Sequence, residues 1–213
     1  MSRLLQDVTG ELSKLPGIGR RTALRLAIHL LRMEPDSVSD MTRSIDRFRR
    51  DIKYCKLCNN LSDEEICPIC ADRELLARLI QCEAGGEGED GMKAVAGVVM
   101  NRVHAKGGEY ARVGQGSIRN IIFQPGQFVC ASETERGSYN PQNIYNMRPT
   151  DIHYEIADWA IAGNRLNGLG TALWFFNPFS PSCRANFPSN VGTFVMRIGD
   201  HCFYNPTAAY YDT

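Results

Sequence analysis

The first thing that this sequence lacks is a net charge. Its 24 lysines and arginines are balanced by 24 aspartates and glutamates, so no strong overall field favours binding to nucleic acid or to an anionic membrane. A run of about 18 apolar residues is also missing, which excludes a transmembrane helix. The opening segment, MSRLLQDVTGELSK, has no apolar core of the signal-peptide type. The sequence therefore predicts a protein that is cytoplasmic as written and has no membrane span.

A flexible linker is missing as well, although the chain changes character near residue 72. The length of 213 residues and the hydrophobic content of 43% suit one or two globular domains. A cysteine-rich segment passes directly into an apolar helical pattern, without a stretch rich in glycine, serine or proline. We therefore expect two modules, residues 1–72 and 73–213, that abut almost directly.

The eight cysteines fall into two groups. The pattern C-x2-C-x8-C-x2-C predicts one closed, structural zinc site, with the ligands Cys55, Cys58, Cys67 and Cys70. Two disulfides are the competing interpretation, and the missing secretion signal disfavours it. The other four are most simply buried thiols: Cys82, Cys130, Cys183 and Cys202. A Cys130–Cys183 or Cys183–Cys202 disulfide is the alternative for a domain that works outside the cytosol.

Two short helical patterns flank the turn Pro16-Gly17-Ile18-Gly19 and predict a helix–hairpin–helix. Glycines let the backbone approach a phosphate closely, and the next helix points its N-terminal amides toward it. The candidate DNA-binding residues are Gly17, Gly19, Arg20, Arg21 and Arg25. The alternative is an αα-hairpin that only packs against its neighbours.

A third helix is expected next, with Asp36 as its N-cap. Its buried stripe would be Met41, Ile45, Phe48 and Ile52. The arginines of this helix alternate with Asp46 and Asp51, which indicates a solvated face.

LSKLPGIGRRTALRLAIHLL and the knuckle YCKLCNNLSDEEICPIC together resemble the N-terminal part of the recombination mediator RecR. The resemblance covers residues 1–72, and the Toprim domain and C-terminal segment of that family have no counterpart here. It implies subunit assembly and DNA binding. We therefore expect a homodimer through residues 1–72, whose short apolar helices need a partner, and weak, salt-dependent affinity for DNA.

The stretch from Leu75 to Val103 predicts two helices joined by a glycine-rich break. Apolar residues at helical spacing mark the buried faces, which comprise Leu75, Leu76, Leu79 and Ile80, then Val95, Val98, Val99 and Val103. Asp90 is the expected N-cap of the second helix. Glu83 ends the first helix. Its carboxyl is either half-buried in a cleft wall, with a raised pKa suited to proton transfer, or simply solvated.

The C-terminal part predicts shorter elements. A polar loop spans residues 106–116, and residues 132–149 are irregular. A helix is expected from Asp151, with Ile152, Ile156, Trp159 and Ala160 toward the core, and a strand over residues 171–176. Gly199-Asp200 predicts a type II′ hairpin turn between residues 193–198 and 201–204. Alternation along the first of these strands puts Phe194, Met196 and Ile198 on one face.

Four ordered blocks in residues 73–213 resemble the CwlJ/SleB-type cell-wall hydrolases, a spore cortex-lytic family. They are Arg78–Arg102, Ile122–Phe128, Ala172–Pro178 and Ile198–Pro206. The resemblance implies that Glu83 is the catalytic acid and that peptidoglycan is the substrate, cleaved during germination. Candidate substrate-binding residues are Glu87, Gln127, Phe128, Trp174, Phe176, Asn177 and Tyr204. The expected fold is α+β: a small helical module with a zinc knuckle, then a lysozyme-like or lytic-transglycosylase-like domain with a small antiparallel sheet.

Glycoside hydrolysis normally needs two carboxylates, and a second one well separated from Glu83 is not obvious. Glu133, Glu135 and Asp151 stay open as alternatives. The resemblance favours the lytic transglycosylase route, in which one glutamate serves as acid and then as base. Two other functions remain open, a DNA-binding fragment through residues 1–72 and a non-catalytic wall-binding domain. Whether the two modules form a natural fusion, a mis-joined frame or an engineered chimera also stays open.

Overall fold

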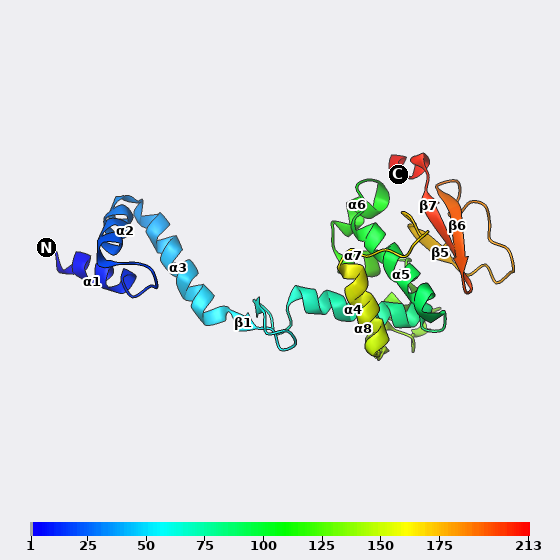
Figure 1. Ribbon diagram of the computed structural model, residues 1–213, viewed down its shortest axis with the longest axis horizontal. Helices are drawn as coiled ribbons and strands as arrows, with labels where there is room; N and C mark the ends of the chain where they lie inside the picture. The colour runs from blue at the N-terminus through cyan, green and yellow to red at the C-terminus, as the bar shows by residue number, and fades with distance from the viewer. Residues whose placement is uncertain (1) are drawn as a thin grey trace. The chain divides into compact units, whose positions relative to one another are not determined.

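The computed structural model describes residues 2–213 and divides into two compact units, Met1–Cys67 and Pro68–Thr213. The first unit begins with the helices α1 (Arg3–Leu12) and α2 (Arg20–Arg32), followed by α3 (Pro35–Asp51) (Figure 1). A two-stranded antiparallel sheet of β1 (Lys53–Tyr54) and β2 (Leu61–Ser62) ends it. The turn between α1 and α2 places Gly17 at a φ of 79°, a backbone conformation that favours glycine. The expected helix–hairpin–helix is thereby confirmed.

Helix α3 corrects two expectations. Its N-cap is Glu34, followed by Pro35 at the first helical position, so Asp36 lies in the first turn and is not the cap. Three residues of the predicted buried stripe are solvent-exposed instead, since Met41 is 46%, Ile45 57% and Phe48 58% exposed, and α3 contains no buried residue. The fourth, Ile52, follows the helix as its C-cap and is half-buried. Helical spacing gathers these side chains on one face, but within the described part of this unit no other element covers that face.

The second unit is built around α4 (Pro68–Ala84) and α5 (Gly88–Val103). The expected faces of both helices are buried, which confirms the two apolar stripes. Helix α5 begins earlier than expected, with Glu87 as N-cap, so Asp90 lies in its first turn. Residues 106–116 are not a plain loop, because they contain α6 (Gly108–Gly114), anchored where the hydroxyl of Tyr210 accepts from the Tyr110 N–H at 2.9 Å.

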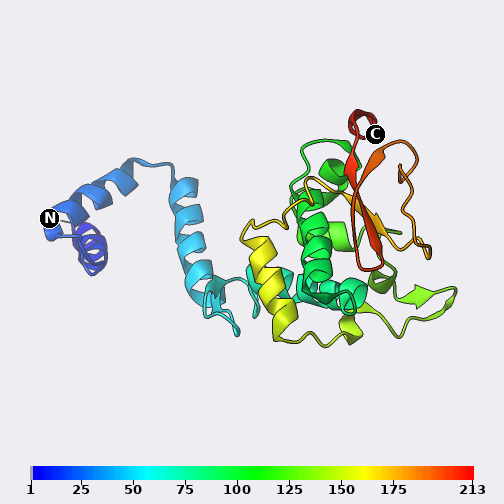
Figure 2. The same cartoon turned by 45° about the vertical axis from the view of Figure 1, so that its right-hand side comes forward.

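Helices α7 (Ile118–Ile122) and α8 (Asp151–Ile161) complete the helical layer. The sheet has the order β5-β7-β6, all antiparallel, from β5 (Trp174–Phe176), β6 (Gly192–Ile198) and β7 (His201–Pro206). Helix α5 lies between α8 and this sheet (Figures 1 and 2). This mixture of helices and a small antiparallel sheet confirms the α+β class.

Gly199, at a φ of 53°, makes the expected tight turn between β6 and β7. A bulge between Phe194 and Met196 interrupts the alternation, since Phe194 pairs with Tyr204 while Met196 pairs with Phe203. Neighbouring residues of β7 point to opposite faces, so Phe194 and Met196 do as well. The expectation that Phe194 shares a face with Met196 and Ile198 is therefore wrong.

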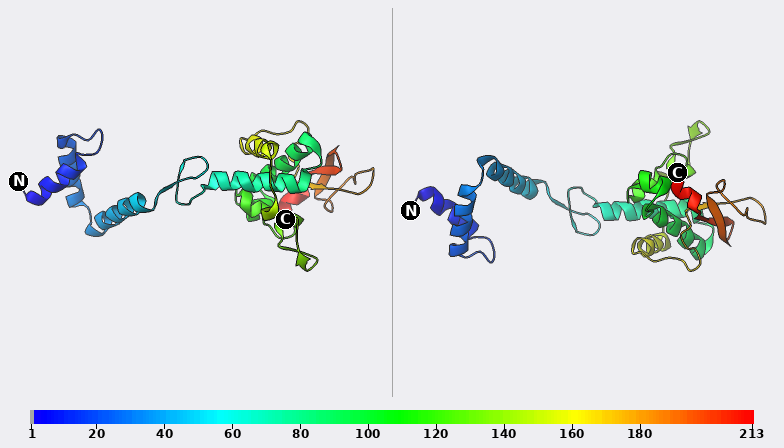
Figure 3. Two further views of the ribbon diagram at one scale, coloured as in Figure 1. Left: turned by 90° about the horizontal axis from the view of Figure 1, so that it is seen from below. Right: turned by 90° about the horizontal axis from the view of Figure 1, so that it is seen from above.

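The segment between α7 and α8 is largely irregular, as expected. It contains the short helical turns η1 (Val129–Ala131) and η2 (Ile144–Asn146) and one small hairpin, β3 (Thr134–Glu135) with β4 (Ser138–Tyr139). This hairpin projects from the helical body (Figures 2 and 3). The chain ends in a last helical turn, η3 (Ala208–Asp212).

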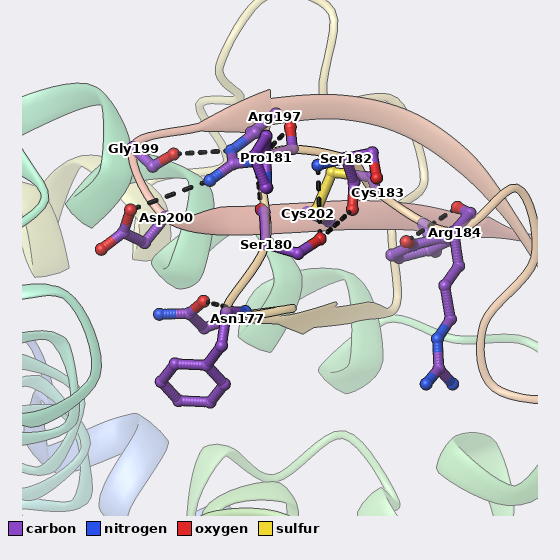
Figure 4. Close-up of a disulfide and its surroundings, with 12 residues drawn as sticks. Asn177, Ser180, Pro181, Ser182, Cys183, Arg184, Arg197, Gly199, Asp200 and Cys202 are labelled. Atoms are coloured by element: carbon purple, nitrogen blue, oxygen red, sulfur yellow. Dashed lines mark hydrogen bonds and ion pairs between the residues drawn. A yellow bond between two sulfur atoms is a disulfide. The ribbon is translucent and has the colours of Figure 1, made fainter.

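A disulfide joins Cys183 to Cys202 and ties the loop after β5 to strand β7 (Figure 4). It is one of the two pairings left open by the sequence. Arg197 supports the same loop, because its guanidinium donates to the carbonyls of Ser180 and Pro181. The loop is thus fixed to the sheet by a covalent bond and by hydrogen bonds.

Candidate active site

Glu83 lies in the last turn of α4, one residue before the helix ends. The buried face of α4 fixes the helix against the core, and the backbone turns away at Gly85 and Gly86. A Cβ added to Gly85 would lie 2.5 Å from the carbonyl oxygen of Gln81, so glycine permits the tight exit that follows Glu83. The half-buried Glu83 carboxyl therefore stands at the border between the core and the surface.

The environment of Glu83 favours its neutral form. Burial raises the pKa of this carboxyl above its ordinary value, and the Cys130 thiol and the charge of Arg102 oppose that rise. The Cys130 Sγ donates to Glu83 Oε1 at 3.5 Å. A carboxyl that keeps its proton beyond the ordinary range can act as a general acid.

Arg102 is a buried charge that the sequence analysis missed. It is 4% exposed, its Nε donates to the carbonyl of Leu173 at 2.7 Å, and its guanidinium lies 4.6 Å from the Tyr110 ring and 5.2 Å from the Phe128 ring. Burial lowers the pKa of Arg102, and the carboxylate of Glu83 is among the groups that counter this. A signal was present, because Arg102 follows Val98 by four positions and Val99 by three, which puts it on the apolar stripe of α5.

Glu87 is the N-cap residue of α5, and its side chain is hydrogen-bonded to the turn between β6 and β7. Its Oε2 accepts from the backbone N–H of Asp200 at 2.8 Å, and its Oε1 lies 3.8 Å from His201 Nδ1. A Cβ on Gly199 would collide with this carboxylate. Glu87 therefore holds the β6–β7 turn against the start of α5, and both of its oxygens face protein groups.

Gln127 and Phe128 also face other protein groups. The Oε1 of Gln127 accepts from the hydroxyl of Tyr110 at 2.9 Å. Phe128 is buried beneath the guanidinium of Arg102. These two residues thus pack with Tyr110 and Arg102, and Gln127 keeps its side-chain amide N–H groups for other partners.

The aromatic candidates on the sheet separate into two groups. Trp174 is buried, with its ring 5.2 Å from that of Tyr210. Tyr204 is 0% exposed, and its hydroxyl donates to the carbonyl of Arg184 at 2.9 Å. This position does not fit the expected role of Tyr204 in substrate binding, because its ring has no exposed surface that a substrate could contact.

Phe176 and Asn177 lie at the half-buried end of β5. The Phe176 ring stacks on that of Phe187 at 4.3 Å. Asn177, labelled in Figure 4, accepts at its Oδ1 from the N–H of Phe179 at 2.8 Å. Phe179 itself is exposed. Partly exposed rings beside an amide are suited to contact with sugar C–H faces.

The thiols of Cys55, Cys58, Cys67 and Cys70 form one cluster, with all four Sγ atoms within 4.8 Å of one another. Hydrogen bonds from backbone N–H groups, chiefly that of Cys67 at 3.3 Å, lower the pKa of Cys55 to about 6. Four thiolates at this spacing form the donor set of a structural zinc site. The residues present therefore fit the zinc expected from the sequence.

The hairpin residues proposed to contact DNA lie on the surface of the first unit. Helix α2 begins at Arg20, with Gly19 as N-cap, and Arg20, Arg21 and Arg25 are exposed. Arg20 and Arg21 line a groove of about 600 Å³ between α1 and α2. The structure thus places two arginines at the N-terminal end of one helix, beside Gly17.

Comparisons with known proteins match three parts of the chain. The profile of the family described as Cell Wall Hydrolase matches residues 86–204. The RecR helix-hairpin-helix profile matches residues 5–48, and the profile of the RecR zinc-finger domain, which has four cysteines, matches residues 52–72. Glu83 itself lies just outside the first of these matches.

Two curated relatives each match about a third of the chain. The chain is 54% identical over 71 residues to the recombination protein RecR of Bacteroides thetaiotaomicron, which covers 33% of this chain and 35% of that protein. It is 48% identical over 79 residues to RecR of Bacteroides fragilis, covering 37% and 38%. The chain thus spans little more than a third of the length of the RecR proteins that it matches.

Two solved structures resemble the second unit. One is the catalytic domain of the germination-specific lytic transglycosylase SleB from Bacillus anthracis, at 25% identity and a TM-score of 0.47. This likeness covers 63% of the present chain and 93% of that one. The catalytic domain of the Bacillus cereus SleB protein is 26% identical, with a TM-score of 0.45, covering 63% and 89%.

Proposed function

Since the chain belongs to the Cell Wall Hydrolase family, we propose that residues 73–213 form a catalytic domain that cleaves the glycan strands of peptidoglycan, with Glu83 as general acid and base. The observation that carries this proposal is the position of Glu83. Its half-buried carboxyl ends a core helix, and burial raises its pKa.

The favoured reaction is that of a lytic transglycosylase. Glu83 gives its proton to the glycosidic oxygen as the bond from that oxygen to the muramic C1 breaks. The resulting carboxylate then takes the proton of the muramic 6-hydroxyl, whose oxygen forms a new bond to C1. The product is a 1,6-anhydro end, and Glu83 recovers its proton. The buried charge of Arg102 favours the carboxylate formed between the two steps.

A route with one carboxylate agrees with the surroundings of Glu83. Retaining and inverting glycosidases use a second carboxyl group at a defined separation. Glu87, the next acidic residue along the chain, is bonded to the β6–β7 turn. Glu133 and Glu135 lie in or beside the small exposed hairpin, and Asp151 begins α8. They are the next candidates if Glu83 fails its test.

For the substrate we propose spore cortex or vegetative wall peptidoglycan, with Phe176 and Asn177 at the glycan-binding surface. No helix in residues 2–213 is long and apolar enough to cross a membrane.

For residues 1–72 we propose a retained RecR-like module that binds zinc, forms a homodimer and binds DNA weakly. The exposed face of α3 and the arginines beside Gly17 support this second role.

The test is cleavage of purified peptidoglycan by the full chain and by Glu83→Gln. Glutamine keeps the shape of the side chain but cannot transfer a proton, so we expect a loss of about 10²–10⁴-fold. Mass spectrometry of the products should detect 1,6-anhydro ends. The matched control is Glu89→Gln, an exposed position in the first turn of α5 that should keep its activity. Near-normal turnover by Glu83→Gln would refute the assignment, and hydrolysed ends alone would refute the transglycosylase route.

A further inference from the structure

Two cysteines lie beside Glu83. Cys82 precedes it on α4, and Cys130 comes from η1. The two Sγ atoms and a Glu83 carboxylate oxygen all lie within 4.8 Å of one another. From this geometry we propose that Cys82, Glu83 and Cys130 form a second metal site, which takes a thiophilic divalent cation such as zinc and blocks the catalytic carboxyl.

The spacing of the donor atoms agrees with such a site. Zinc binds thiolate sulfur at about 2.3 Å and carboxylate oxygen at about 2.0–2.2 Å, so the sulfur–oxygen edge of a tetrahedral site is about 3.5 Å long. The Cys130 Sγ lies 3.5 Å from Glu83 Oε1. Within the four-cysteine cluster, the Sγ atoms of Cys58 and Cys67 are similarly 3.6 Å apart.

Two of the three donors are neighbours on α4, and the third comes from η1. Successive residues of a helix do not face each other, and Cys82 and Glu83 are successive. Cys130 closes the triangle from a different element. The Asn140 side chain fixes the backbone of that segment by donating to the carbonyls of Val129 and Ser132, both at 3.0 Å. The donors are thus held by α4 and by a separately anchored turn.

Access and coordination number also suit a reversible ligand. Cys130 is 1% exposed, whereas Cys82 and Glu83 are only half-buried, so a cation can enter from the surface. Three protein ligands leave a fourth position for water or a substrate group, in contrast to the closed four-thiolate site. We therefore expect the second cation to bind more weakly than the first.

Occupation of this site would stop the reaction, because the metal would bind the carboxylate that has to carry the proton. This consequence rests on the proposed function, but the binding of the metal does not. The two parts can therefore be tested separately on the same preparation of the full chain.

The binding test is a zinc titration of reduced, metal-free protein with a chromogenic indicator, followed by elemental analysis. We expect two equivalents for the unmodified chain and one for Cys82→Ala, which keeps the four-cysteine cluster. Cys58→Ser should instead lose the tighter equivalent. If Cys82→Ala disturbs the fold, Cys130→Ser gives the same stoichiometric test. One equivalent in both the unmodified chain and Cys82→Ala would overturn the proposal, as would a Cys82–Cys130 disulfide that re-forms under the titration conditions.

The activity test measures muropeptide release with added zinc and with a chelator. Zinc should inhibit the unmodified chain, and Cys82→Ala should need at least tenfold more zinc for the same inhibition. Equal zinc sensitivity of the two proteins would overturn the inhibitory role. Two bound equivalents without any cleavage, even with the chelator, would support the metal site and refute the proposed function instead.

Discussion

Similar apolar helical patterns end in opposite environments in the two units. In the second unit, the stripes of α4 and α5 are buried, and Leu76 and Val95 are both 0% exposed. In the first unit, Ile45 and Phe48 on α3 are more than half exposed. A sequence pattern therefore identifies which face of a helix is apolar, but not whether the same chain covers it. We infer that the second unit is stable by its own core, whereas the first depends on a metal and a partner.

The largest effect should follow from the loss of the structural zinc. Structural zinc contributes an apparent binding free energy of about 10–16 kcal/mol in small zinc modules. The first unit supplies three of the four cysteines and has few buried apolar residues to replace the metal. Cys58→Ser should unfold the knuckle, with fast hydrogen exchange at the amides of β1 and β2. Both tryptophans lie in the second unit, so its folding can be followed separately by fluorescence. Loss of peptidoglycan cleavage in Cys58→Ser would contradict the independence of the two units.

The exposed face of α3 predicts the next largest effect. If a second copy covers it, the chain is a dimer, and Ile45→Asp with Phe48→Asp should make it monomeric in light scattering at tens of micromolar. The charges would otherwise be buried without partners, which is costly. Ser44→Asp adds charge to the same helix at an exposed polar position and should remain dimeric. A monomeric unmodified chain would contradict the expectation.

The next effect concerns DNA binding, which we expect to be weak and to depend strongly on salt. Arg20→Ala with Arg21→Ala should abolish it, because these two arginines supply the charge at the N-terminus of α2. Arg49→Ala with Arg50→Ala removes the same charge from α3, where Arg50 already pairs with Asp46, and should have less effect. Fluorescence anisotropy at two salt concentrations would measure this. Tight, salt-insensitive binding would show that the hairpin has been misinterpreted.

A smaller effect is expected at Glu87. Glutamine keeps an oxygen for the Asp200 N–H but loses the charge beside His201, so Glu87→Gln should reduce activity only a few-fold. Glu87→Ala also removes the hydrogen bond to that exposed N–H, whose net contribution is about 0.5–1.5 kcal/mol. The melting temperature followed by tryptophan fluorescence should therefore fall more for Ala than for Gln. A loss in Glu87→Gln as large as that in Glu83→Gln would assign the acid to Glu87.

Several of these features could be predicted from the sequence, because local rules determine them. Cysteine spacing gave the four-thiol cluster, helical periodicity gave α4 and α5, and Gly199-Asp200 gave the hairpin turn. The position of Glu83 at a helix end followed from the glycines after it. That much of the candidate site needed only neighbours along the chain.

The rest of the site depended on contacts between distant segments. The aromatic run at residues 174–176 did not show which rings are covered, and the burial of Tyr204 comes from rings far away in the sequence. The bulge in β6 turns the Phe194 side chain to the opposite face of the sheet from Met196. Simple alternation along the strand did not predict this. Arg102 was missed because a charged residue at a helix end is usually solvated, whereas here Tyr110 and Phe128 enclose it.

The smallest effect tests the second unit through Glu74, which joins α4 to α8. Its carboxylate accepts from Arg78 and from the hydroxyl of Tyr154, both at 2.6 Å. Burial alone would raise the pKa of Glu74, but the hydrogen bonds from Tyr154 and Arg78 outweigh it and hold the pKa below its ordinary value.

Because the folded pKa of Glu74 is lowered, the unfolded chain takes up this proton first as the pH falls. The stabilising contribution is therefore complete above the ordinary glutamate pKa of about 4.3 and is lost as the pH falls through the lowered value. Glu74→Gln should melt slightly below the unmodified chain at pH 7, and the difference should shrink toward pH 3. Glu155→Gln, an exposed position on α8, should show no such trend. A difference in melting temperature between Glu74→Gln and the unmodified chain that stays constant with pH would mean that the hydrogen bonds hold α4 to α8 without the charge.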